Sequence, residues 1–125
     1  MQNSIAENIA TFLKQYEPFN FIEYTDLKAI VLNSNILTLQ KGKTLFKIND
    51  QLHDSFYIVY SGVIHLTKVL DAEEVLHSKC YSGNLFGLRP FFAKNNYVLN
   101  ATANEDAILY AIPIAVFKPY LTKYT

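Results

Sequence analysis

The sequence predicts a mainly β domain of the sandwich or barrel type with helices at its two ends. From Ile36 to Ile112, short β-rich runs alternate with turn residues at intervals of about eight to twelve residues, which is the spacing of antiparallel strands in such folds. Helical periodicity is confined to the segments before and after this region. A length of 125 residues fits one domain, large enough to bury roughly two-thirds of the surface of the unfolded chain.

The chain is expected to have three parts: a helical segment at 1–34, a β core at 35–112 and the start of a C-terminal helix at 113–125. Pro113 suits the first turn of that last helix because it has no amide hydrogen to leave unpaired. An apolar stripe at helical spacing follows it. The stripe consists of Ile114, Phe117, Leu121 and Tyr124.

Two helices are predicted in the first part. Ser4 and Glu7 form a capping box that opens a helix over residues 4–16, and Pro18 ends it. Thr25 is expected to cap a second, shorter helix. Each helix has one apolar stripe: Ile5, Ile9, Phe12, Leu13 and Tyr16 in the first, and Leu27, Ile30 and Val31 in the second.

Seven strands are predicted in the β core. The run 56–60 is apolar on both faces, so it belongs in the middle of the fold. Residues 71–74 read as the acidic, exposed tip of a hairpin, and the last two strands are expected to form a hairpin about 104–106. The predicted strands are 36–39, 44–48, 56–60, 63–70, 75–81, 98–103 and 107–112.

Composition argues against nucleic acid and membranes as partners. Eleven basic and eleven acidic residues cancel, so no net field attracts a polyanion. No apolar run approaches the length that crosses a bilayer, and the first residues lack the plan of a signal peptide. A single cysteine, Cys80, fits a reducing compartment. We therefore expect a cytoplasmic protein.

Residues 82–103 carry the strongest signal for function. Gly87 lets the backbone approach a bound group closely, and the amides after it would face outward from a helix start, an arrangement that suits an anion. Pro90 fits the first turn of that helix. The pattern predicts a phosphate cradle.

The same stretch resembles the phosphate-binding cassette of cyclic nucleotide-binding domains. Phe86-Gly87, the apolar pair Phe91-Phe92 and Ala103 match the cassette, and the apolar run 56–59 with its closing Ser61-Gly62 matches the second signature of the family. The resemblance covers roughly residues 17–121. It implies a jelly-roll-type β-roll (a double-stranded β-helix), a short cassette helix and a regulatory function in sensing a ligand.

Two positions depart from the family pattern, which makes the cassette degenerate. Leu88 stands where the family has the glutamate that holds the ribose hydroxyl, and Tyr97 stands where it has the arginine that pairs with the cyclic phosphate. Val98 replaces the small residue that follows. Because losing one member of a buried charged pair costs roughly 2–5 kcal/mol, we expect weak or no affinity for cyclic AMP.

Several residues are candidates for contacting a ligand. Arg89 is the chain's only arginine; it is either a relocated anion contact or a solvated surface residue. Tyr97 either stacks on a base or, as we expect, packs across the pocket and fills it. Asn100 is expected on the far side of the cassette. The full candidate set is Phe86, Gly87, Leu88, Arg89, Pro90, Tyr97, Val98 and Asn100.

Neither a metal site nor a catalytic site is expected, and no cofactor other than a cyclic nucleotide or another small anion. His53, His65 and His77 lie too far apart in sequence for a local set of metal ligands, and no carboxylates accompany them. The serines in turns and Cys80 have no identifiable base. We predict that the chain is not an enzyme.

Two functions remain open. The stretch FGLRPFFAKNNYVL followed by YAIPIAVFKPYL is similar to the N-terminal module of bacterial signalling proteins that carry CBS and nucleotidyltransferase-like domains. This resemblance implies a regulatory, ligand-sensing module whose partners are a nucleotide-like small molecule and downstream domains of a longer chain. The alternative is a nucleotide-independent domain for protein interaction or homodimerisation. A DNA-binding regulator would need a helix-turn-helix that this sequence does not encode.

Overall fold

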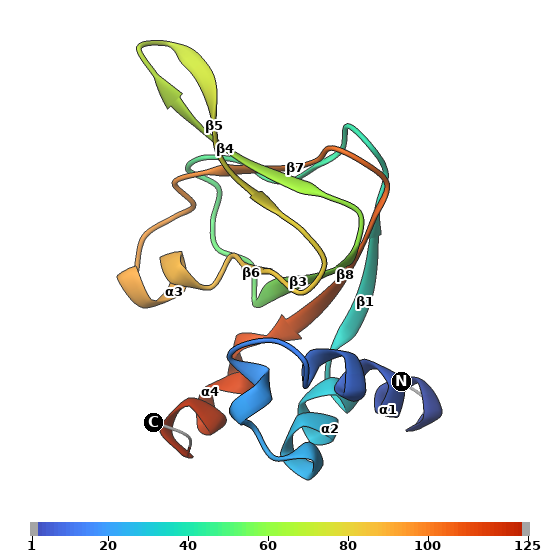
Figure 1. Cartoon of the computed structure of the whole chain (residues 1–125). Coiled ribbons are helices and arrows are strands. Elements are labelled where there is room, and N and C mark those ends of the chain that lie inside the picture. Colours follow the sequence, from blue (N-terminus) through green and yellow to red (C-terminus); the bar gives the residue numbers. More distant parts are fainter. Residues whose placement is uncertain (1–2, 124–125) are drawn as a thin grey trace.

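The computed structural model describes residues 3–123, and these form a β-roll with helices gathered at one end (Figure 1). One sheet has the strand order β1-β8-β3-β6 and the other β2-β7-β4-β5, with antiparallel pairing throughout. The predicted fold class is confirmed. The elements are α1 Asn3–Leu13, η1 Phe19–Phe21, α2 Tyr24–Leu32, β1 Asn35–Leu39, β2 Thr44–Phe46, β3 Ser55–Ser61, β4 Ile64–Leu70, β5 Glu73–Cys80, β6 Leu85–Phe86, α3 Arg89–Ala93, β7 Asn100–Ala103, β8 Ala107–Pro113 and α4 Ile114–Lys123.

Strand β3 joins the two hydrophobic cores, as its doubly apolar sequence predicts. Phe56 and Ile58 are fully buried against the helices, whereas Tyr57 and Val59 are buried on the opposite face, inside the roll. Successive side chains of a strand alternate between its faces, so an all-apolar strand must be covered on both. β8 likewise contributes side chains to both cores, so the helical end and the roll share two paired strands.

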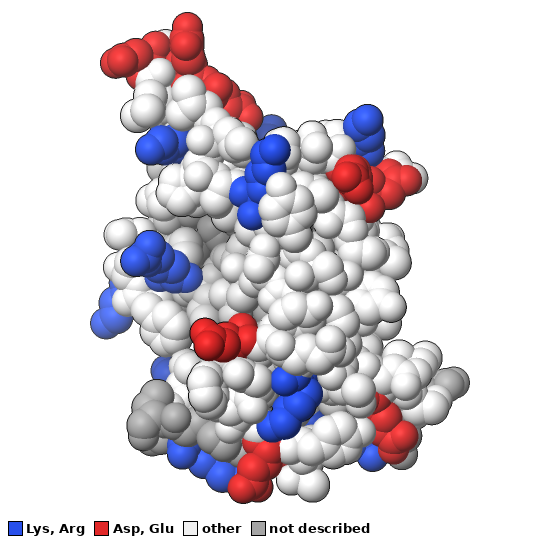
Figure 2. All heavy atoms as spheres, in the orientation of Figure 1, with Lys and Arg blue, Asp and Glu red and all other residues white. Residues whose placement is uncertain are grey.

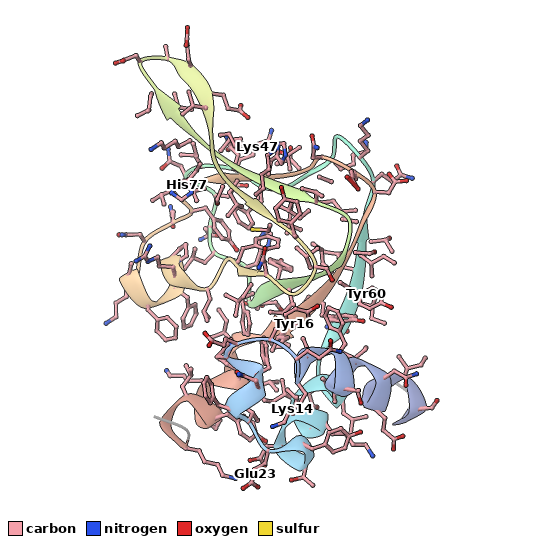
Figure 3. All side chains as sticks on the ribbon, viewed as in Figure 1. Lys14, Tyr16, Glu23, Lys47, Tyr60 and His77 are labelled. Carbon is pink, nitrogen blue, oxygen red and sulfur yellow. The ribbon has the colours of Figure 1, made fainter. Side chains whose placement is uncertain are left out.

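Aromatic rings attach the helices to the roll. Phe12 of α1 lies 5.0 Å from Tyr60 and 5.1 Å from Tyr16, measured between ring centroids. Figure 3 places Tyr16 and Tyr60 at the junction of the helices and the roll. Nearer the start of β3, the ring of Phe56 lies 5.0 Å from that of Phe117 in α4. Edge-on and tilted aromatic contacts of this kind add to the stability gained from burial.

The last two strands do not form the predicted hairpin. β7 pairs with β2 and β4, whereas β8 pairs with β1 and β3 in the other sheet. Residues 104–106 form a corner that carries the chain between sheets: the amide of Asn104 donates to the Val63 carbonyl at 2.9 Å. Buried Ala101, Ala103 and Leu109 face the same interior, which requires the two strands to lie on opposite walls.

Helix boundaries also differ from the sequence-based expectation. α1 ends at Leu13 rather than residue 16, and the Nζ of Lys14 donates to the carbonyls of Asn20 and Ile22, which lie in and just after the 3-10 turn that follows. α2 begins two residues earlier than predicted, because its N-cap is Glu23 and not Thr25. Side chains that pack in tertiary structure set these ends, and the local capping signals do not.

Candidate ligand-binding site

The predicted cradle is formed by the turn from β6 into α3. Gly87 has φ of +83°, a backbone conformation that residues with a side chain rarely adopt, and Pro90 occupies the first turn of α3 as expected. The amide of Phe91 donates to the Leu88 carbonyl at 3.1 Å, and Lys94, with φ of 57°, ends the helix. The cassette thus consists of a short strand, a glycine turn and a single helical turn.

A cavity of about 430 Å³ opens beside this turn, within the size range of small-molecule sites. Figure 2 shows the surface hollowed between the β4–β5 hairpin and α3. Its walls come from β2, β4, β5, the cassette and the segment that leads into β7. The lining residues are Phe46, Leu66, His77, Leu85, Phe86, Gly87, Leu88, Arg89, Pro90, Ala93, Asn95, Tyr97, Val98 and Leu99.

Tyr97 forms a wall of the cavity and does not fill it. Its side chain is 1% exposed, and its ring stacks on Phe46 with 3.7 Å between centroids and an interplanar angle of 5°. Its hydroxyl accepts a hydrogen bond from the amide of His53 at 3.1 Å. Because the ring is fixed in this stack, the cavity stays open, and the expectation that Tyr97 packs across it is wrong.

Behind this wall lies a second polar contact, between Tyr57 and His53. The Tyr57 hydroxyl lies 2.5 Å from Nδ1 of His53. Burial raises the pKa of Tyr57 to about 12, and the neighbouring Tyr97 adds to the rise. Burial likewise raises the pKa of Tyr97, outweighing the hydrogen bond from His53. Both phenols therefore stay neutral, and this wall offers no charge to a ligand.

Arg89 lies at the cavity with its charge uncompensated by protein. The residue is exposed and contributes to the lining. No carboxylate among residues 3–123 lies within ion-pair distance of it, and the lining contains no aspartate or glutamate. Its guanidinium can therefore donate to a ligand without first breaking an ion pair.

His77 is a cavity residue that sequence reasoning missed. The strand register places Leu66 opposite Ser78 and Thr67 opposite Leu76, so His77 is the extra residue of a β-bulge in β5. Bulges change the direction of a side chain beside a site. In Figure 3 His77 lies where the β4–β5 hairpin leaves the roll, on the side of α3. Its sequence position alone gave no signal, because a bulge depends on pairing between strands.

Comparison with known proteins identifies the family. The profile described as "Cyclic nucleotide-binding domain" matches residues 36–124. The chain belongs to the cyclic nucleotide-binding domain family. Domains of this family are regulatory sensor modules and not catalytic ones. A comparison with curated protein sequences found no match.

Solved structures share this fold over almost the whole chain. The sensor domain of the transcriptional regulator DNR from Pseudomonas aeruginosa is 19% identical, with a TM-score of 0.86, covering 97% of this chain and 81% of that one. The regulatory domain of Toxoplasma gondii PKA, solved with cAMP, is 20% identical (TM-score 0.85; 95% and 45% covered). A regulatory subunit of a cAMP-independent protein kinase A from Trypanosoma cruzi, bound to guanosine, is 13% identical (TM-score 0.83; 94% and 44% covered). This chain thus spans less than half of the two kinase-related chains.

The structure of this cyclic nucleotide-binding domain brings seven of the eight candidate residues to the cavity and leaves one outside. Asn100 is not part of the lining; its Oδ1 accepts from the amide of Ile48 at 2.9 Å, and its Nδ2 donates to Oγ1 of Thr67 at 3.4 Å. It alternates along β7 with buried Ala101 and so faces outward. The seven lining candidates are Phe86, Gly87, Leu88, Arg89, Pro90, Tyr97 and Val98.

Within residues 3–123, no group of three or more histidine, cysteine or acidic side chains is placed to hold a metal ion. Burial raises the pKa of the Cys80 thiol to about 11, so this thiol is a poor nucleophile. None of the helices described there is long and apolar enough to cross a membrane.

Proposed function

We propose that this domain is a regulatory module that binds a small organic molecule in the cavity beside α3 and has weak or no affinity for cyclic AMP. The observation that supports this most is an open cavity at the cassette whose walls carry Leu88 and Tyr97 in place of the two charged groups of the family pattern. A concave, mostly apolar cavity of this size is typical of small-molecule sites, and a domain used only for protein association does not need one.

The electrostatics of the cavity argue against the family's usual mode of binding. A cyclic phosphate carries a full charge, and burying it without a partner costs several kcal/mol. The ring of Tyr97 is held against Phe46 and its hydroxyl is occupied by His53, so neither supplies a cation. Leu88 offers no acceptor for ribose hydroxyls. Loss of one such contact corresponds to a factor of about thirty to several thousand in affinity.

A related protein offers a precedent for a ligand other than cyclic AMP. The Trypanosoma cruzi subunit is described as cAMP-independent and is bound to guanosine. By analogy, this domain keeps the family fold and uses it to bind a ligand other than cyclic AMP. Together with the resemblance to modules that precede CBS and nucleotidyltransferase-like domains, this supports a sensor that acts on downstream domains of a longer, cytoplasmic bacterial protein. A nucleotide-independent domain for homodimerisation is less favoured, because it gives no reason for an open cavity.

The cavity can be tested with a neutral fluorescent probe, N-phenyl-1-naphthylamine. We expect saturable binding that Val98→Trp blocks, because Val98 lies in the lining yet is 60% exposed, so a larger side chain there narrows the opening without disturbing the core. Val69→Trp is the matched control: Val69 is 52% exposed on the hairpin and outside the lining. Binding that is absent, or equal in both variants, would contradict the proposal.

A further inference from the structure

The cavity has an uneven distribution of polar groups. Two of its lining side chains are basic or titratable nitrogen groups, Arg89 from α3 and His77 from β5, and no lining side chain is a carboxylate. The two come from different elements, one placed by the cassette turn and the other by the β-bulge. A ligand in the cavity therefore meets donors on two sides and no negative charge.

The rest of the lining is largely apolar. Phe46, Phe86 and Tyr97 are at most 4% exposed, and Phe46 and Tyr97 stack on each other, so these rings form a packed apolar side of the cavity. Leucine, proline, valine and alanine side chains and one polar residue, Asn95, account for most of the remaining lining. Sugar hydroxyls would lose hydrogen bonds to water there without gaining a carboxylate acceptor, which costs free energy.

One tautomer of His77 can donate a hydrogen bond to a ligand. Its Nδ1 lies 3.2 Å from the hydroxyl of Ser78. When that hydroxyl donates to Nδ1, the ring proton is on Nε2, and the N–H at Nε2 is available to an acceptor on a ligand. Arg89 adds a planar fork of donors that matches two oxygens of a carboxylate or phosphate.

Building on the proposed function, we propose that the ligand is a small organic anion with an apolar body, whose carboxylate or phosphate is bound by Arg89 with His77 as a second donor. The charged contact then lies at α3 and β5, and not at position 97, where the family pattern has its arginine. The ligand consequently needs no ribose, and its apolar body lies against the leucine, proline and valine side chains of the lining.

Two dyes that differ by a single charged group test this inference. 1-Anilinonaphthalene-8-sulfonate has the aromatic body of N-phenyl-1-naphthylamine plus a sulfonate, which stands in for the carboxylate or phosphate. We expect the anionic dye to bind at least about tenfold more tightly than the neutral one in fluorescence titrations. The preference is the ratio of the two affinities, and it is expected to fall about tenfold in Arg89→Ala and about threefold in His77→Ala.

Lys79→Ala is the matched control, because Lys79 is an exposed cation two positions from His77 on β5 and lies outside the lining. This variant should leave the affinity for both dyes unchanged. Equal affinities for the two dyes, or an unchanged preference in Arg89→Ala or His77→Ala, would overturn the assignment while leaving the cavity intact. Failure of both dyes to bind would instead overturn the proposed function.

Competition separates the two anionic groups. 1-Naphthaleneacetate and 1-naphthyl phosphate are both expected to displace the anionic dye, and the better competitor identifies the preferred group. 1-Naphthaleneacetamide has the same body without the charge and should displace it at least about tenfold less well. Displacement by the amide at the same concentration as the acetate would overturn the role of the charge.

Discussion

Two segments line the cavity, and they differ in how much of the family pattern they retain. The cassette turn, residues 86–90, retains its shape through Gly87 and Pro90. The segment that leads into β7 has replaced its charged position by Tyr97, which is now part of the hydrophobic core. The difference shows that backbone geometry and ligand chemistry are separable: a glycine and a proline maintain a wall whether or not the opposite wall still carries a charge.

The largest effect on stability is expected from substitutions of Tyr97, the cavity residue that is packed in the hydrophobic core. Tyr97→Ala removes a fully stacked, buried ring and should lower the free energy of unfolding by about 3–5 kcal/mol, measured by urea denaturation. Tyr97→Phe keeps the stack and loses only the hydrogen bond to His53, so about 0.5–1.5 kcal/mol is expected. Equal losses in the two variants would mean that the stack contributes little.

In the cassette turn, substitutions are expected to act through the conformation of the backbone at Gly87. Gly87→Ala forces a side chain into φ of +83° and is expected to cost about 1–2 kcal/mol of stability and to weaken binding of N-phenyl-1-naphthylamine. Gly42→Ala is the control, since Gly42 has φ of +86° and open space around it, but lies outside the cavity. It should lose similar stability with unchanged dye binding. Unaltered dye binding in Gly87→Ala would show that the conformation of this turn does not contribute to the binding site.

A smaller effect is expected from pH. The pKa of Tyr57 is about 12 in the fold, against an ordinary value of about 10. Between these values the unfolded chain releases the proton and the folded chain keeps it, so the free energy of unfolding falls as pH rises above about 10. Tyr57→Phe should reduce this fall between about pH 10 and about pH 12 in urea titrations. If the free energy of unfolding falls equally in Tyr57→Phe and in the unaltered protein, titratable groups other than Tyr57 cause the fall.

Most of the architecture was predictable because it depends on local patterns. The doubly apolar run 56–60 identified the central strand, and Gly87 with Pro90 identified the turn and helix of the cassette. Five of the seven lining candidates lie in that turn, residues 86–90, and the other two, Tyr97 and Val98, followed from the family pattern. Periodicity and turn chemistry are properties of short segments, so one sequence suffices to read them.

What escaped prediction depends on pairing between distant segments. The bulge at His77 exists only relative to β4, and the outward face of Asn100 follows from its place opposite Thr67. The assignment of β7 and β8 to different sheets likewise depends on the corner at 104–106 and its contact with Val63. A bulge or a switch between sheets is defined only relative to the partner strand, so the pattern of a single strand does not reveal it.

Calorimetric titration with cyclic AMP and cyclic GMP tests the central claim most directly, because it asks whether a cavity without the two charged contacts still binds a cyclic phosphate. We predict no binding at concentrations on the order of micromolar for either nucleotide. Affinity tighter than about 1 micromolar for either one would contradict the account of Leu88 and Tyr97.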